Sequence, residues 1–226
     1  MYNGAFSPQK EGDTVLHLIA GIDEAGRGAL AGPVVASCVI LPPYFLTDIL
    51  DDSKRLSPTK RRNIAALLKG SACYGVGQAG EKLIDQENIL RATFCAMKAA
   101  FDIMQERLPQ WLKFAYSDRK GERISLDIIV DGNALPFKVD DTSTDATLTD
   151  VDEANIAAVV KADSFIPSVQ AASIIAKVAR DELMVRYGAV YPGWGYEKHK
   201  GYPTRAHKEA LSRLGPSPIQ RLTFKW

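Results

Sequence analysis

The sequence predicts an α/β domain with a mixed sheet. Its 226 residues fit one large domain or at most two small ones. Apolar residues make up 46% of the chain and charged residues 24%, which excludes disordered, collagen-like and disulfide-scaffold proteins. Apolar runs of strand length come first as a hairpin set and later alternate with helical segments. This order indicates a mixed sheet covered by helices.

Five short apolar runs are predicted as strands. A glycine-rich turn joins the first two, which favours a hairpin. The fourth is almost wholly apolar and ends at Asp131-Gly132-Asn133, which is typical of a central strand that enters a turn. The predicted strands cover residues 16–22, 34–41, 72–76, 126–130 and 156–160.

Helical periodicity and end signals predict the helices. Ser57 and Pro58 fit the N-cap and first position of an amphipathic helix. A second, longer helix is expected to end before Pro109, because proline disrupts a helix interior. The predicted helices cover residues 58–68, 81–108, 168–187 and 204–214.

The chain divides into a short tail and one domain. Residues 1–13 are polar and are expected to form a flexible N-terminal tail, and residues 14–226 form the domain. The acidic, Thr-rich residues 137–153 are expected to form an exposed loop. The formal net charge is only +1, yet residues 161–226 hold eleven Lys or Arg against five Asp or Glu. A basic C-terminal extension over about residues 190–226 follows.

Cysteine usage and hydropathy predict a cytoplasmic protein without a membrane role. Cys38, Cys73 and Cys95 stand apart in apolar settings, and we expect packed, reduced thiols. No secretory signal pattern opens the chain. The longest apolar stretch, residues 29–41, is too short to span a bilayer and contains Gly32 and Pro33.

Acidic residues follow three of the predicted strands. Asp23 and Glu24 come directly after the first, Asp131 after the fourth and Asp163 shortly after the fifth. An isolated Asp-Glu pair is more often a solvated strand end. Ligands of open α/β sheets collect at strand ends, however, so these acids could converge. Clustered carboxylates repel each other and need a cation, and oxygen ligands favour Mg²⁺ or Mn²⁺. Such a site suits metal-dependent phosphoryl chemistry.

Two glycine patterns raise a dinucleotide-binding alternative. Gly26, Gly28 and Ala31 fit G-x-G-x-x-A, and Gly75, Gly77 and Gly80 fit G-x-G-x-x-G. After the first pattern comes a β-branched run instead of a helix, and Asp23 and Glu24 would repel a pyrophosphate. The second is not followed by an acid at a strand end. A nucleotide cofactor is therefore the weaker interpretation.

Five motifs occur in order: GIDEAGRGALAGPVV, DDSKRLSPTKR, IIVDGN, KADSFIPSVQAASIIAKVARD and HKGYPTRAH. Together with their spacing they closely resemble the bacterial ribonuclease HII family, the type 2 ribonucleases H. The resemblance covers about residues 19–224. It implies a ribonuclease H-like fold, that is, a five-stranded mixed sheet flanked by helices, with a C-terminal helical extension.

The resemblance also implies an activity. It predicts endonucleolytic cleavage, dependent on Mg²⁺ or Mn²⁺, of RNA in RNA–DNA hybrids and at single ribonucleotides in duplex DNA. The family's four carboxylates match Asp23, Glu24, Asp131 and Asp163. Its ribonucleotide-sensing turn matches Gly26, Arg27 and Gly28, and its HKGY tyrosine matches Tyr202.

Basic and aromatic residues predict contacts with the nucleic acid. The stretch around the first helix start supplies Ser53, Lys54, Arg55, Lys60, Arg61 and Arg62, where either phosphate binding or a solvated face is expected. In the extension, aromatic rings alternate with cations that include Lys198 and Lys200, a pattern that suits a nucleic-acid groove. Asp181 is expected to form a salt bridge within its helix or to pack against Lys177, in preference to binding a metal. Ala171, Ala172 and Ser173 are expected to let that helix press against the sheet.

Two other functions remain open at this point. The chain could be a catalytically silent hybrid-binding protein or a metal-dependent DNA nuclease of the same superfamily. We expect a monomer. Residues 220–224 faintly resemble a sliding-clamp peptide, although packing of this segment on its own domain is the favoured interpretation.

Overall fold

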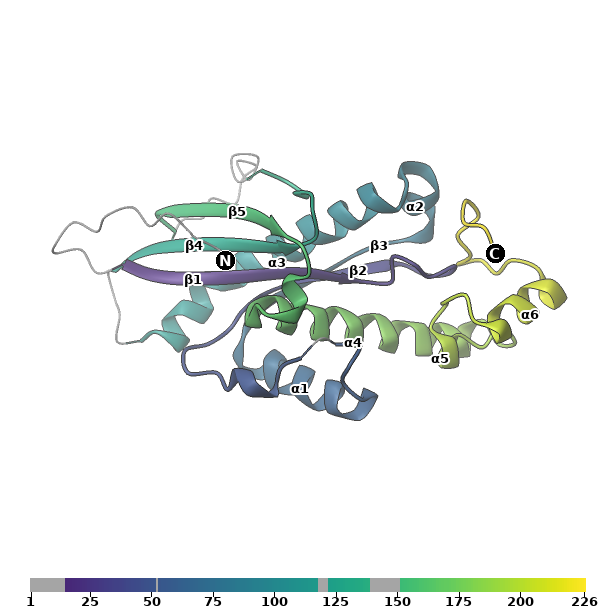
Figure 1. Ribbon diagram of the computed structural model, residues 1–226, viewed down its shortest axis with the longest axis horizontal. Coiled ribbons are helices and arrows are strands. Elements are labelled where there is room, and N and C mark those ends of the chain that lie inside the picture. Colours follow the sequence, from purple (N-terminus) through teal and green to yellow (C-terminus); the bar gives the residue numbers. More distant parts are fainter. Residues whose placement is uncertain (1–14, 52, 118–121, 139–150) are drawn as a thin grey trace.

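The computed structural model describes residues 15–51, 53–117, 122–138 and 151–226 (Figure 1). It has the predicted α/β architecture, with one five-stranded sheet in the order β3-β2-β1-β4-β5. The strands are β1 (Val15–Ala25), β2 (Val34–Ile40), β3 (Cys73–Ala79), β4 (Arg123–Asp131) and β5 (Glu153–Val159). The predicted tail and most of the predicted acidic loop fall outside the described residues.

The sheet is mixed, as predicted. β1 pairs with β2 and β2 with β3 in antiparallel register, whereas β1 pairs with β4 and β4 with β5 in parallel register. β1 therefore stands at the centre, between the antiparallel half and the parallel half. It extends to Ala25, so Asp23 and Glu24 belong to the strand itself and do not follow it.

Helices cover both faces of the sheet. They are α1 (Pro58–Ser71), α2 (Glu81–Glu87), α3 (Ile89–Ala115), α4 (Pro167–Val190), α5 (Tyr196–His199) and α6 (Arg205–Leu214). α3 lies on one face, and α1 and α4 lie on the other (Figure 1). On the α3 face, alternate β1 residues Leu18, Ala20 and Ile22 join its apolar core. On the opposite face, Val39 packs with residues of α1 and α4 in a second core.

The predicted helix over residues 81–108 begins where expected, but it is wrong in two other respects. It is broken at Asn88, whose φ of 75° ends α2 and whose side chain caps α3. α3 then continues through Pro109 to Ala115. Pro109 has no N–H, so the helix loses one backbone hydrogen bond there. Packing of the residues beyond it compensates for this loss. Trp111 packs against the core and donates from Nε1 to the Ser71 oxygen at 2.8 Å, which favours continuation.

One prediction about the cysteines is also wrong. Cys38 and Cys73 are buried on adjacent strands, as expected, but Cys95 is exposed on α3. All three are free thiols. Burial raises the pKa of Cys73 to about 12, so this thiol stays protonated at neutral pH.

The C-terminal extension packs back onto the domain. α5 and α6 follow α4, and the chain then returns to the start of β2, where Gln220 forms a β-bridge with Ala31. Asp85 of α2 accepts hydrogen bonds from the backbone N–H groups of Leu222 and Thr223 at 2.9 and 3.0 Å. The last residues are thereby tied to both the sheet and α2.

Two glycines test how closely α3 packs on β3. A Cβ at Gly75 would lie 2.0 Å from the backbone oxygen of Ala100, whereas a Cβ at Gly70, exposed in α1, would meet nothing within 4 Å. We expect Gly75→Ala to destabilise the protein by about 1–3 kcal/mol, because rigid backbone must move. Gly70→Ala should instead stabilise it by about 0.5–1 kcal/mol. Thermal unfolding of both variants checks this, and equal stabilities would contradict the packing.

Candidate active site

The sheet register brings two predicted carboxylates together. Ile22 of β1 pairs with Val130 of β4, so Asp23 and Asp131 come next on adjacent parallel strands. Both lie on the face that α4 covers, opposite the apolar residues that face α3. Asp163 comes from the short 3₁₀ helix Ala162–Ser164 that follows β5. Carboxylate oxygens of the three residues lie within 4.8 Å of one another.

Glu24 lies beside this group and not within it. Its Oε1 accepts from Nη1 of Arg27 at 3.3 Å, and the Arg27 side chain is half exposed. Burial raises the pKa of Glu24, Arg27 opposes the rise, and the Asp131 charge adds to it. Three of the four predicted acids therefore gather, and the fourth adds its negative charge from the next position of β1.

The acidic group is electrostatically strained without a cation. Burial and the Glu24 charge raise the pKa of Asp23 well above its ordinary value. Burial and the neighbouring Asp163 raise the pKa of Asp131. Partly buried carboxylates at this spacing disfavour full ionisation unless a positive charge neutralises them. An all-oxygen donor set of this kind fits Mg²⁺ or Mn²⁺.

Neighbouring backbone and hydroxyl groups hold these acids in place. Asp131 Oδ1 accepts from the Ala162 N–H at 2.7 Å, which fixes the start of the 3₁₀ helix against β4. Asp23 hydrogen-bonds with the Ser173 side chain on α4. Ser173 Oγ in turn lies 2.8 Å from Ser53 Oγ. Sequence reasoning assigned Ser173 only a packing role; a polar residue on the apolar face of a helix was the available signal.

The cations around the start of α1 divide into structural and exposed ones. Lys54 Nζ lies 3.6 Å from Asp163 Oδ2, at the edge of the acidic group. Arg61 of α1 is buried and donates to the backbone oxygens of Ser53 and Leu56. It therefore fixes the segment before α1 and is not free to bind a phosphate. Ser53 is likewise buried. The exposed cations here are Lys54, Arg55, Lys60 and Arg62.

Asp181 has the predicted structural role. Its Oδ1 accepts from Lys177 Nζ at 2.8 Å on the same helix, and its Oδ2 lies 3.6 Å from Arg61. The contact with Arg61 joins α4 to α1. Asp181 does not belong to the acidic group.

The turn after β1 needs its first glycine. Gly26 has φ of +99°, and a Cβ there would lie 1.9 Å from Nε of Arg180. Gly28 is exposed, and a Cβ there would meet nothing within 4 Å. Arg180 and Arg221, both fully buried, lie beneath this turn. No sequence pattern marks these two arginines, because their surroundings are set by segments far apart in the chain.

Tyr202 lies close to this turn. Its ring is half-buried, 5.1 Å from Lys177 Nζ and 5.2 Å from the guanidinium carbon of Arg180. Lys198 is exposed on α5, whereas Lys200 is partly buried and its ammonium donates to backbone oxygens of Glu197 and Lys198. Of the two lysines, Lys198 is the one with its charge open to a ligand.

The two histidines of this region are structural. Their rings stack with centroids 4.4 Å apart. His199 Nε2 donates to the Trp194 oxygen and His207 Nδ1 donates to the Tyr202 oxygen, because a carbonyl can only accept. Burial lowers the pKa of both rings. The stack fixes the backbone on both sides of Tyr202.

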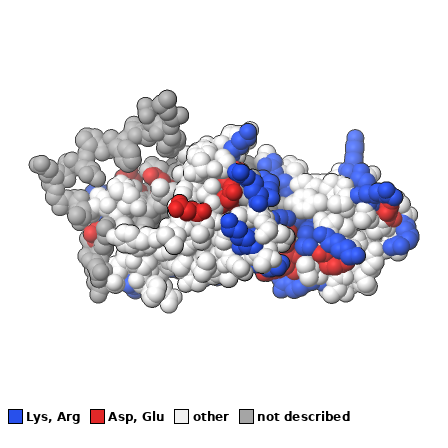
Figure 2. Space-filling model, turned by 60° about the horizontal axis from the view of Figure 1, so that its bottom comes forward, with Lys and Arg blue, Asp and Glu red and all other residues white. Residues whose placement is uncertain are grey.

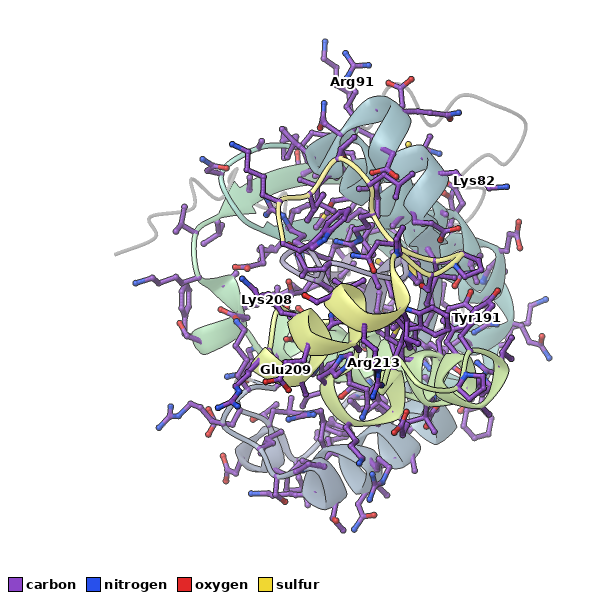
Figure 3. The ribbon with its side chains drawn as sticks, turned by 90° about the vertical axis from the view of Figure 1, so that its right-hand side faces the viewer. Lys82, Arg91, Tyr191, Lys208, Glu209 and Arg213 are labelled. Atoms are coloured by element: carbon purple, nitrogen blue, oxygen red, sulfur yellow. The ribbon has the colours of Figure 1, made fainter. Side chains whose placement is uncertain are left out.

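Cations gather over one part of the surface. Figure 2 shows Lys and Arg side chains over the right-hand half of the view, where α5 and α6 lie in Figure 1. Figure 3 views the molecule from that end, with Lys208, Glu209 and Arg213 on α6. The acid Glu209 is paired with Arg205 at 2.7 Å. This distribution agrees with the basic extension expected from the sequence.

An α/β domain with a mixed five-stranded sheet, an acidic group at its strand ends and a basic surface defines the class of metal-dependent nucleases with a ribonuclease H-like fold. The family model for ribonuclease HII matches residues 20–226. The chain is 44% identical over 209 residues to ribonuclease HII of Treponema denticola, covering 92% of this chain and 98% of that protein. It is also 44% identical over 211 residues to ribonuclease HII of Geobacter sulfurreducens, covering 92% and 82%. The chain belongs to the ribonuclease HII family, and it is a metal-dependent endoribonuclease.

Solved structures confirm the fold. Ribonuclease H2 from Pyrococcus horikoshii OT3 matches with a TM-score of 0.56 and 25% identity, over 92% of this chain and 94% of that one. A chain in the structure of the PCNA:RNase HII complex from Archaeoglobus fulgidus matches with a TM-score of 0.60 and 23% identity, over 92% and 96%. Both support the predicted ribonuclease H-like fold.

Two further predictions concern a membrane and a sliding clamp. Within the described ranges, none of the helices combines the length and apolarity needed to cross a membrane. Gln220 and Arg221 are buried and bond to the backbone of residues 26–32, so this part of the clamp-like segment packs on its own domain. Leu222 and Trp226 are exposed, and clamp binding stays a prediction.

Replacing Asp131 with Asn should preserve the fold and remove nearly all cleavage in Mg²⁺. The pKa of Asp131 is raised, so the folded state favours its protonated carboxyl. In the absence of metal, the contribution of this carboxyl to the free energy of unfolding is present at acid pH and is lost as the pH rises through the raised pKa. The side chain of Asn does not ionise, so the variant avoids this loss of stability. At neutral pH in EDTA its melting temperature should equal or exceed that of the wild type. A variant that unfolds, or that keeps wild-type turnover, would contradict the assignment.

Proposed function

We propose that this enzyme hydrolyses the RNA strand of RNA–DNA hybrids and nicks duplex DNA on the 5′ side of an embedded ribonucleotide. The products would carry 3′-hydroxyl and 5′-phosphate ends. The acidic group at the ends of β1 and β4, in a chain of the ribonuclease HII family, is the observation that carries this proposal. We infer that residues 14–226 act as one domain and as a monomer.

Asp23, Asp131 and Asp163 would hold two divalent ions, Mg²⁺ or Mn²⁺, with Glu24 beside them. When bound, such ions activate a water for attack on the phosphodiester and stabilise the leaving 3′-oxygen. The protein's part is to hold the acids at fixed spacing. The Ala162 N–H and the Ser173 hydroxyl support this role, because each bonds directly to one of the three carboxylates.

Substrate recognition would fall to the turn of residues 26–28 and to Tyr202. Backbone N–H groups of Gly26, Arg27 and Gly28 suit a 2′-hydroxyl, which tells RNA from DNA. The 2′-hydroxyl is read and is not the nucleophile. Arg27, Lys54 and Lys198, whose side chains are exposed, would contact phosphates. Lys200 and Ser53 would act more indirectly, because both are engaged within the protein.

Three duplexes test the proposal. One carries a single ribonucleotide, one is an uninterrupted RNA–DNA hybrid, and one is all DNA. We expect Mg²⁺- or Mn²⁺-dependent cleavage of the first two and none of the third, with 3′-hydroxyl and 5′-phosphate ends identified by mass spectrometry. Binding without cleavage would indicate a silent hybrid-binding protein. Cutting of the all-DNA duplex would indicate a DNA nuclease.

Tyr202 should distinguish the two cleaved substrates. Its ring could stack on the deoxyribose after a ribonucleotide, an interaction worth about 1 kcal/mol or somewhat more. We therefore expect Tyr202→Ala to lose several-fold more activity on the single ribonucleotide than on the uninterrupted hybrid. Tyr202→Phe should lose little on either, because it keeps the ring near Lys177 and Arg180.

The alternative for Tyr202 is a purely structural role between its two cations. Truncation would then lower both activities equally and also lower the melting temperature. Measuring the two rates and the melting temperature for both variants decides between the roles.

A further inference from the structure

Two fully buried arginines support the turn of residues 26–33. Arg180 comes from the middle of α4, and Arg221 comes from the C-terminal segment. In the part of the chain that the structure describes, neither guanidinium forms an ion pair with a carboxylate. Burying a cation is costly unless hydrogen bonds compensate for its lost hydration. Backbone carbonyl oxygens supply that compensation here.

Arg221 bonds to the turn at three points. Its Nη2 donates to the Gly26 oxygen at 2.8 Å, its Nη1 to the Arg27 oxygen at 2.9 Å and its Nε to the Gly32 oxygen at 2.9 Å. Its backbone N–H also donates to the Leu30 oxygen at 2.9 Å. A planar guanidinium is suited to such divergent contacts, and a lysine ammonium is not. Arg221 thus fixes both ends of the turn.

Arg180 joins the same turn to the Tyr202 segment. It donates to the oxygens of Pro33 and Ala31 at 2.9 and 3.2 Å and to the Lys200 oxygen at 3.0 Å. Its guanidinium also lies near the Tyr202 ring. Arg221 therefore bonds to the backbone oxygens of residues 26, 27 and 32, and Arg180 bonds to those of residues 31, 33 and 200.

The carbonyl contacts of Arg221 decide where two N–H groups point. In a trans peptide the C=O and the following N–H point in opposite directions, and the described residues contain no cis peptide. Because the oxygens of Gly26 and Arg27 point toward Arg221, the N–H groups of Arg27 and Gly28 point away from it. Within the described residues these two N–H groups have no hydrogen-bond partner. They face the open side of the turn, where Gly28 is exposed.

We propose that Arg221 is a positioning residue for ribonucleotide specificity: it aims the N–H groups of Arg27 and Gly28 outward as paired donors for a 2′-hydroxyl. This inference rests on the proposed function, since it assigns the turn to the sugar of the ribonucleotide. The C-terminal segment then sets the discrimination between RNA and DNA without touching the substrate.

The charge of Arg221 is compatible with this role. Burial and the neighbouring Arg180 charge lower the pKa of Arg221 to about 9, so the guanidinium remains charged at neutral pH. Charged donors form the stronger hydrogen bonds to carbonyl oxygens. Asp85 anchors the segment just beyond it, accepting from Leu222, Thr223 N and Thr223 Oγ1.

The test is the ratio of two dissociation constants, which does not depend on turnover. Dissociation constants are measured in EDTA for a duplex with one ribonucleotide and for the same duplex in all-DNA form. We expect the wild type to prefer the first duplex. Arg221→Lys keeps the positive charge but loses the three-point contact, so this preference should fall about tenfold, the effect of two neutral hydrogen bonds. Affinity for the all-DNA duplex should change less than about twofold, because the charge is retained.

Two further variants make the test decisive. Arg186→Lys, exposed on α4, is the matched control and should keep the wild-type preference. Asp85→Ala loosens the anchor beyond Arg221 while leaving the arginine intact, and should lower the preference about threefold. If Arg221→Lys does not fold, the Asp85→Ala result decides alone.

An unchanged preference in a folded Arg221→Lys would overturn the inference. If Arg221→Lys does not fold, an unchanged preference in Asp85→Ala would overturn it instead. In either case, nicking by the wild type would leave the proposed function intact. A wild type that neither prefers nor nicks the ribonucleotide duplex would overturn both.

Discussion

Parallel pairing of β1 with β4 places like charges side by side. The register that pairs Ile22 with Val130 puts Asp23 next to Asp131, and the 3₁₀ helix after β5 adds Asp163. The carboxylates cannot relax by a shift of register, because a slip of one residue would turn the apolar residues of β1 away from α3. The hydrophobic core thus holds a repulsive group together, and a divalent cation relieves the repulsion.

A second set of contacts couples this acidic group to the rest of the site. Ser173 on α4 bonds to Asp23 and to Ser53, and Lys54 lies beside Asp163. α4 also carries Arg180, which reaches the turn after β1 and the segment before Tyr202. One helix therefore holds the proposed metal ligands, the turn proposed to read the ribonucleotide and the Tyr202 ring in fixed positions relative to one another. Its small residues allow this, because they let it lie close to the sheet.

The basic C-terminal extension has two different parts. Cations on α5 and α6, such as Lys198 and Lys208, are exposed and give the surface its positive character. Arg221 is fully buried and acts on the protein's own backbone. Counting charge along the sequence treats both alike. The distinction matters, since loss of an exposed cation weakens binding to any nucleic acid, whereas loss of the buried one should change which sugar is preferred.

Local patterns in the sequence determined the strands, most helix starts and the acids of the site. Apolar runs, the Ser57 cap and the carboxylates near strand ends depend on neighbouring residues, so they can be recognised without the fold. Only the tertiary structure decided that α3 continues through Pro109, that Arg61 is buried, and that Ser173, Arg180 and Arg221 support the site. These features depend on contacts between segments up to 195 residues apart, which no local pattern encodes.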